Sequence, residues 1–134
     1  MNKLITSIVC CIGIFSFACS SDDDDPQIKS LKVCTELSNN KCSSHHSELN
    51  PNVGSIYSSA ELVGIKNAEV AISLWAWDGQ EWLEVAQTTI NNGDKNLVHA
   101  TFTNNGPWPM TDYEVEYFVD SDPQLTAVID FVVQ

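Results

Sequence analysis

Arginine is absent from this sequence, and positively charged side chains of any kind are few. The chain has six Lys and 18 Asp or Glu residues, which give a formal net charge of −12. Such a surface repels phosphate groups, so we expect no nucleic acid among its partners. The same charge opposes electrostatic adhesion to anionic lipid, so any attachment to a membrane needs a lipid or apolar anchor.

Motifs for catalysis and for cofactors are also missing. The sequence has no glycine-rich phosphate loop, and no glycine-framed serine supports a catalytic triad with His99. Glu114 and Glu116 are two residues apart, which places them on one face of a strand, and we interpret them as part of a solvated face. We therefore expect a protein that is not an enzyme and that has no cofactor.

Candidate metal ligands are scattered along the chain. His45 and His46 lie in a serine-rich segment, where adjacent histidines are typical of a solvated loop. Asp120-Ser121-Asp122 and Asn92-Gly93-Asp94 offer oxygen atoms, but neither has the spaced ligands of a dedicated calcium site. We interpret both as hairpin turns and expect no metal site.

Only one long apolar run occurs, and it is at the N-terminus: Leu4–Phe17, which follows Lys3. This run is too short to span a hydrocarbon layer of about 30 Å comfortably, so it is typical of an export signal. Ala18 precedes Cys19, as a lipoprotein signal peptidase requires, although Ser16 stands where leucine is usual. The alternative is an ordinary cleaved signal followed by a solvated linker.

Cys19 is followed by two serines and the acidic run Asp22–Asp25. This start resembles surface lipoproteins of the Bacteroidetes type, in which an acidic stretch after the lipidated cysteine directs the protein to the outer leaflet of the outer membrane. The resemblance implies a signal peptide over residues 1–18 and a tether over residues 19–26, held to the membrane by lipid on Cys19. It also implies outer-membrane localisation with exposure at the cell surface; an anchor that faces the periplasm is the alternative.

The five cysteines divide into three groups. Cys10 and Cys11 belong to the signal and Cys19 to the anchor, which leaves Cys34 and Cys42 as an even pair in an oxidising compartment. Seven residues separate this pair, including the turn-forming Ser38-Asn39-Asn40, so we expect a disulfide that closes a small loop. A metal site with His45 and His46 is the alternative, although zinc sites favour closer cysteine spacing.

Past the tether the apolar residues alternate with a period of two, and no stretch has a sustained helical period. Turn-forming residues separate the alternating runs. The expected strands are 28–35, 56–63, 69–77, 80–87, 96–103, 112–120 and 125–133. These features predict an all-β, antiparallel, two-sheet sandwich of about seven strands over residues 27–134.

Asp78-Gly79 between alternating apolar runs is a strong hairpin signal. A two-residue loop at this point would place Trp75 opposite Trp82, Leu74 opposite Leu83, Ile72 opposite Val85 and Ala71 opposite Ala86. One face of the hairpin then carries Val70, Ile72, Leu74, Ala76, Leu83 and Val85. The other face carries Ser73, Trp75, Trp77, Trp82 and Glu84. Because apolar residues dominate the first face, we expect it to be the core face.

The second face is the candidate recognition surface. Trp75, Trp77 and Trp82 together offer on the order of 450–750 Å² of ring surface if they are well exposed. A monomer rarely exposes a contiguous apolar patch of more than a few hundred Å² without a function. Aromatic platforms stack on sugar rings and hold peptide side chains. The alternatives are that these tryptophans close the sandwich, cover the segment between Cys34 and Cys42, or form the core themselves.

The segment Trp108-Pro109-Met110-Thr111-Asp112-Tyr113-Glu114-Val115 and the closing Phe131-Val132-Val133 resemble immunoglobulin-like domains of bacterial exported proteins. Thr111 stands where that pattern has glycine. The resemblance implies an immunoglobulin-like sandwich, with the Tyr113 hydroxyl bonded to the backbone as in a tyrosine corner. We expect a noncatalytic module that binds a glycan or an envelope protein, or, as the alternative, a structural accessory subunit of an envelope complex.

Overall fold

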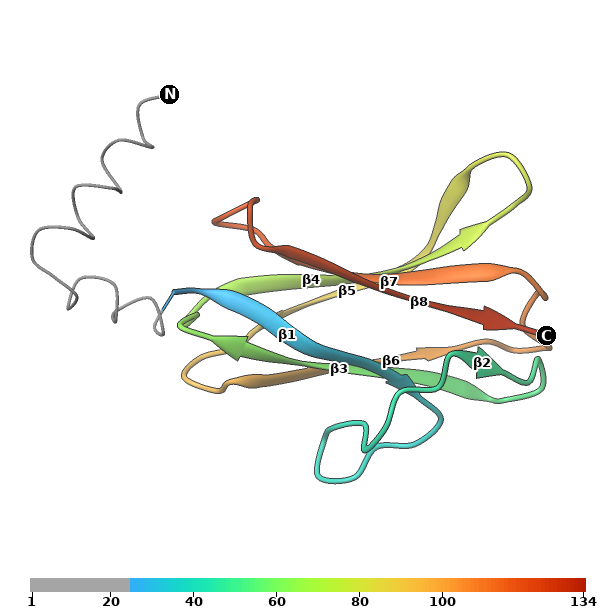
Figure 1. The fold of residues 1–134 in the computed structure, drawn as a ribbon, viewed down its shortest axis with the longest axis horizontal. Helices are drawn as coiled ribbons and strands as arrows, with labels where there is room; N and C mark the ends of the chain where they lie inside the picture. The colour runs from blue at the N-terminus through green and yellow to red at the C-terminus, as the bar shows by residue number, and fades with distance from the viewer. Residues whose placement is uncertain (1–24) are drawn as a thin grey trace, which may run out of the picture.

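The computed structural model describes residues 25–134, so the expected signal peptide, Cys19 and most of the acidic tether lie outside the described residues. The described chain forms strands and connecting loops (Figure 1). The strands are β1 (Gln27–Cys34), β2 (Glu48–Leu49), β3 (Ser55–Val63), β4 (Glu69–Trp77), β5 (Trp82–Asn91), β6 (Leu97–Thr103), β7 (Asp112–Val119) and β8 (Thr126–Val133). In this part of the chain, no helix is long and apolar enough to cross a membrane.

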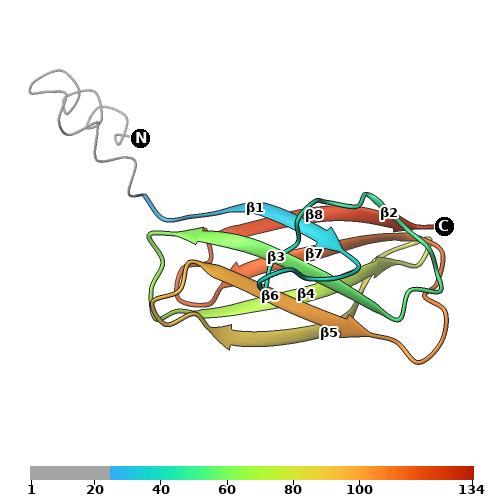
Figure 2. The same cartoon turned by 90° about the horizontal axis from the view of Figure 1, so that it is seen from below.

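The strands form two sheets that face each other (Figures 1 and 2). One sheet has the order β1-β3-β6, and the other has the order β2-β8-β7-β4-β5. The predicted all-β, two-sheet sandwich with immunoglobulin-like organisation is therefore confirmed. The eight strands, one of them only two residues long, agree with the expected number of about seven. The expectation of purely antiparallel pairing needs correction, because the short β2 pairs with β8 in parallel.

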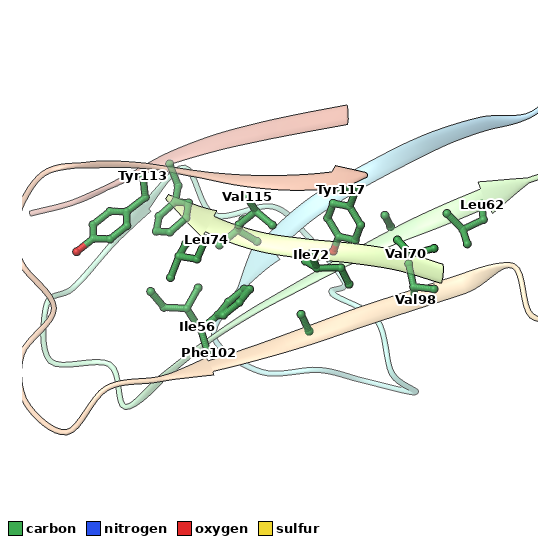
Figure 3. Close-up of a cluster of buried hydrophobic side chains, with 14 of the residues drawn as sticks. Ile56, Leu62, Val70, Ile72, Leu74, Val98, Phe102, Tyr113, Val115 and Tyr117 are labelled. Carbon is green, nitrogen blue, oxygen red and sulfur yellow. The ribbon is translucent and has the colours of Figure 1, made fainter. Parts of the chain in front are cut away.

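The core lies between the two sheets, as the period-two alternation predicts (Figure 3). Val70, Ile72 and Leu74 of β4 have no measurable exposure and lie on the inner face of their sheet. Residues of β3 and β6, including Ile56 and Phe102, meet them from the other sheet. Each fully buried Val, Leu or Ile side chain contributes about 1.5–3 kcal/mol through removal of apolar surface from water.

Three buried aromatic rings close one end of this core. Tyr113 stacks on Phe131 with ring centroids 5.2 Å apart, and Trp108 meets Tyr113 edge-on at 6.3 Å. The Trp108 indole N–H donates to the Val53 carbonyl at 2.9 Å. The Tyr113 hydroxyl donates to the Pro109 carbonyl at 2.7 Å, so the expected bond from this hydroxyl to the backbone is confirmed. Burial raises the pKa of Tyr113 to about 12.

A buried polar contact ties the two sheets together near the middle of the core. The Ser58 hydroxyl of β3 lies 2.7 Å from the Tyr117 hydroxyl of β7 and donates to the Lys32 carbonyl at 2.9 Å. Because a serine hydroxyl has one proton, Tyr117 is the donor to Ser58. Burial raises the pKa of Tyr117, so this phenol stays protonated.

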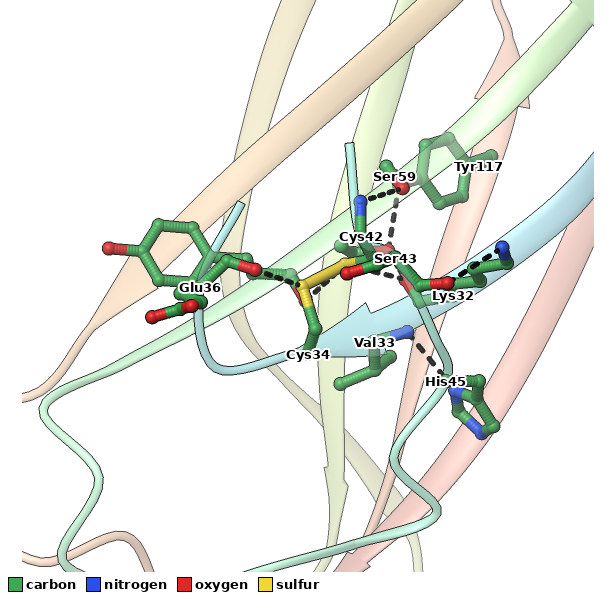
Figure 4. The surroundings of a disulfide bond; sticks show 11 residues. Lys32, Val33, Cys34, Glu36, Cys42, Ser43, His45, Ser59 and Tyr117 are labelled. Carbon is green, nitrogen blue, oxygen red and sulfur yellow. Dashed lines mark hydrogen bonds between the residues drawn. A yellow bond between two sulfur atoms is a disulfide. The ribbon is translucent and has the colours of Figure 1, made fainter. Parts of the chain in front are cut away.

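Cys34 and Cys42 form the predicted disulfide, with their Cα atoms 5.7 Å apart (Figure 4). The loop that it closes turns at Asn39 and Asn40, whose φ angles are 55° and 64°. Asparagine tolerates this left-handed conformation, which explains the turn. The Cys42 amide donates to the Ser59 hydroxyl at 2.9 Å, so the loop is held against β3.

Candidate functional site

The β4–β5 hairpin carries the candidate site, and its turn is longer than predicted. The expected two-residue loop at Asp78-Gly79 is wrong, because residues 78–81 form the connection. The Asp78 carboxylate accepts the amide N–H groups of Gln80 at 2.7 Å and Glu81 at 2.8 Å. These bonds lower the pKa of Asp78 and hold a wider turn than the two-residue type.

This turn shifts the pairing of the two strands by two residues. Trp82 lies opposite Trp77, whereas the prediction placed it opposite Trp75. Because side chains alternate with a period of two, a shift of two residues changes the partners near the turn but leaves the three tryptophans on their predicted face. Trp75, Trp77 and Trp82 therefore share one face, although the predicted pairs are wrong.

A second irregularity lies farther along β5. Trp75 pairs with Glu84 but Leu74 pairs with Ala86, so Val85 is an extra residue at a bulge. Val85 is 50% exposed and Leu83 is 45% exposed, which contradicts their predicted place on the core face. Both residues lie near the turn, and Figure 1 shows that this end of the β4–β5 hairpin projects away from the two layers.

The three tryptophans lie on the outer face of the five-stranded sheet. Trp82 is 36% exposed, Trp75 and Trp77 are half-buried, and Leu74 on the inner face is fully buried. The alternative in which the tryptophans form the core is therefore wrong. The alternative in which they cover the disulfide loop is also wrong, since that loop lies against β3 in the other sheet. Trp77 and Trp82 are in contact, with ring centroids 5.4 Å apart and planes tilted by 59°.

Carboxylates from three strands surround these rings. Trp75 has Glu84 of β5 on one side and Glu114 of β7 on the other, and Asp130 of β8 follows Glu114 in the same row. Asp112 and Glu116 extend the line along β7 at two-residue spacing. We call the surface formed by Trp75, Trp77, Trp82, Glu84, Asp112, Glu114, Glu116 and Asp130 the acidic tryptophan face.

The charges on this face are crowded. Burial, followed by the neighbouring Asp130 and Glu116 carboxylates, raises the pKa of Glu114. Glu84 has a partial partner, because the Gln87 side-chain amide donates to it at 3.0 Å and to Ser73 at 3.1 Å. The sequence correctly placed Glu114 and Glu116 on one face but missed Asp112 and Asp130, whose proximity depends on the pairing of β7 with β8.

Two adjoining hollows lie on the acidic tryptophan face. The first has a volume of about 350 Å³ and is lined by Trp82, Asp112, Glu114, Asp130 and Val132, among others. The second, of about 230 Å³, is lined by Trp75, Trp82, Glu114 and Glu116. Trp82 and Glu114 line both hollows, so a ligand that extends along β7 can contact an indole ring and several carboxylates together.

The other candidate residues from the sequence hold loops in place through hydrogen bonds or the disulfide. His45 accepts the Val33 amide N–H at its Nδ1 atom at 3.1 Å, and burial lowers the pKa of His45 (Figure 4). The Asn92 side chain accepts from Ala68 and donates to Ile65 and Lys95, so it joins two loops. The sulfur atoms of Cys34 and Cys42 are bonded to each other, so neither is a thiolate metal ligand.

Among residues 25–134, no group of three or more His, Cys, Asp or Glu side chains is arranged to hold a metal ion. Comparison with protein-family models and with curated proteins finds no match to this chain. The acidic tryptophan face is therefore the candidate functional site of this chain.

Proposed function

We propose that this protein is a noncatalytic binding or adhesion module that holds a glycan or a protein through the acidic tryptophan face. The observation that carries the proposal is the position of Trp75, Trp77 and Trp82 on the outer face of the larger sheet, beside two hollows. Their indole rings are rigid and partly buried, so a contact with a ligand costs little conformational entropy.

The proposal includes a place for the module. Lipid on Cys19 anchors the chain in the outer membrane, and Asp22–Asp25 direct it to the cell surface. The support is the order of the N-terminal residues: an apolar export run, a small residue, a cysteine and an acidic stretch. A module of this kind is held by its N-terminus and presents its outer sheet face to partners.

A matched pair of substitutions on adjacent residues of β5 tests the binding role. Trp82 and Leu83 are both partly exposed and apolar, but they lie on opposite faces of the hairpin. Trp82→Ala should weaken the binding of the purified protein to glycan and peptide panels, whereas Leu83→Ala should leave binding unchanged. Equal binding by wild-type and Trp82→Ala protein, with both folded, would contradict the proposal.

The anchor is tested separately in cells. Cys19→Ala should abolish labelling with a palmitate analogue and release the chain from the membrane fraction, or leave it uncleaved. Replacing Asp22–Asp25 with asparagine should keep the lipid but reduce digestion of the protein by protease added to intact cells. Unchanged lipid labelling in Cys19→Ala would contradict the anchor, and unchanged protease access in the asparagine variant would contradict the acidic address.

A second candidate function is that of a structural accessory subunit in an envelope complex. It is favoured by the edge of the larger sheet, where β5 pairs only with β4 among the described strands and exposes Leu83 and Val85. Such an edge can accept a strand from another protein. This candidate predicts that Leu83→Ala, and not Trp82→Ala, releases the protein from its complex.

A further inference from the structure

We propose that the ligand of the acidic tryptophan face is a positively charged, extended segment of a partner protein, held with its arginine side chains between the indole rings and the carboxylates. This inference rests on the proposed binding function and names the chemistry of its partner. The glycan alternative is an outcome of the test below.

Positive and negative side chains are separated between the two sheets. The face carries five carboxylates, those of Glu84, Asp112, Glu114, Glu116 and Asp130. None of the lysines among the described residues lies on β4, β5, β7 or β8: Lys29 and Lys32 are on β1, and Lys41, Lys66 and Lys95 are in loops. The carboxylates therefore have no cation on their own strands, and a positively charged ligand complements them.

The acidic tryptophan face combines carboxylates with aromatic rings. Trp75 lies between Glu84 and Glu114 in one cross-strand row, and neighbouring strands are about 4.8 Å apart. A guanidinium group can stack on an indole ring while its edge donates to a carboxylate, and it is more weakly hydrated than an ammonium group. A neutral sugar can stack on the rings and donate its hydroxyl groups to the carboxylates, but it does not neutralise the crowded negative charge.

The acidic residues of β7 are regularly spaced. Asp112, Glu114 and Glu116 occupy alternate positions on β7, which places them about 6.7 Å apart along the strand. Alternate side chains of an extended polypeptide have the same spacing, because two residues rise by about 6.7 Å. An extended segment that lies along β7 can thus present a basic side chain to each acid in turn. The two hollows lie along the same line and share Glu114.

The raised pKa of Glu114 agrees with this geometry. Burial is the largest cause of the raised pKa, and Asp130 from β8 and Glu116 from the same strand add to it by charge repulsion, while β4 contributes only uncharged side chains beside Glu114. A bound guanidinium would relieve this repulsion. Because the sequence contains no arginine, a second copy of this chain cannot supply that group.

The test uses the purified protein and a peptide that alternates arginine with threonine. Its matched control replaces each arginine with citrulline, which has nearly the same shape but no charge. We expect the arginine peptide to bind and the citrulline peptide to bind at least about tenfold more weakly, as the loss of charge-assisted hydrogen bonds implies. Binding of the arginine peptide should also weaken as salt is added.

Two isosteric substitutions separate local recognition from net charge. Glu114→Gln removes one carboxylate from the face, and Glu61→Gln removes one from β3 in the other sheet, where Glu61 lies opposite Lys29. Both change the net charge equally. Glu114→Gln should lower the affinity for the arginine peptide by about tenfold or more, whereas Glu61→Gln should leave this affinity unchanged. Urea unfolding of each variant checks that it is folded.

Several results would overturn the inference. Equal binding of the arginine and citrulline peptides would do so, as would equal loss of binding in Glu114→Gln and Glu61→Gln. Glycan binding that depends on Trp82, with no peptide binding, would overturn the inference of a cationic ligand but would leave the proposed binding function in place. If no ligand in either panel binds in a Trp82-dependent manner, both the inference and the proposed function fail.

Discussion

Leu74 and Trp77 are near neighbours on β4, but their side chains lie on opposite faces of the sheet. Leu74 has no measurable exposure and belongs to the core, whereas Trp77 is half-buried on the outer face beside Trp82. We predict that Leu74→Ala lowers the free energy of unfolding by about 2–5 kcal/mol, through lost burial and the cavity that remains. Trp77→Ala should cost less, because it removes a ring that is only half-buried and a contact with Trp82 that is worth about 0.5–1.5 kcal/mol beyond the buried area.

Urea unfolding followed by circular dichroism measures both changes, and it avoids the fluorescence of the tryptophan that one variant removes. With a slope of about 1–3 kcal/mol per molar urea, a loss of about 3 kcal/mol lowers the midpoint by about 1–3 M. Leu83→Ala is the control, because it removes the same side chain from a position that is 45% exposed and should cost little. A larger midpoint shift for Trp77→Ala than for Leu74→Ala would refute the assignment of the two faces.

Three further predictions concern the framework. Mass spectrometry without reductant should show Cys34 and Cys42 blocked to alkylation, and reduction should cost about 2–3 kcal/mol of stability; free thiols would contradict the disulfide. Ser58→Ala should cost more than Tyr117→Phe, because it leaves the buried Tyr117 hydroxyl without its acceptor; the reverse order would contradict this. The backbone hydrogen bonds to Asp78 lower its pKa, so the stability that the ionised carboxylate contributes is present above the usual value of 3.8 and is lost as pH falls through the folded-state value. A stability difference between wild-type and Asp78→Ala protein that persists at acid pH would contradict this prediction.

The strands were predictable because both the core and the solvent enforce strict alternation. The bounds of β4 match the prediction, and the expected ranges of the other long strands overlap those observed. The two-residue β2 was missed, since a pair of residues has no period to detect. Its place depends on a contact with β8, far away in the sequence, to which it pairs in parallel.

At the turn of the β4–β5 hairpin, two local preferences favour different loop lengths. Asp78-Gly79 favours a two-residue loop, but the Asp78 carboxylate instead accepts two amide groups and stabilises a longer connection. The expected strand 80–87 therefore begins later, at Trp82, and continues to Asn91. Thr88, Thr89 and Ile90 are β-branched, so the sequence did contain a signal for this extension.

The prediction placed the three tryptophans on the correct face despite the error in register, but it gave them the wrong cross-strand partners. A shift of two residues keeps Trp75 on the outer face and replaces its predicted partner Trp82 with Glu84. On its other side Trp75 meets Glu114, because β7 and not a solvent edge adjoins β4. An aromatic platform alone suits a sugar or an apolar side chain, whereas an indole ring between two carboxylates suits a cation. The order of strands in the sheet, which no single segment encodes, thus decides which side chains surround Trp75.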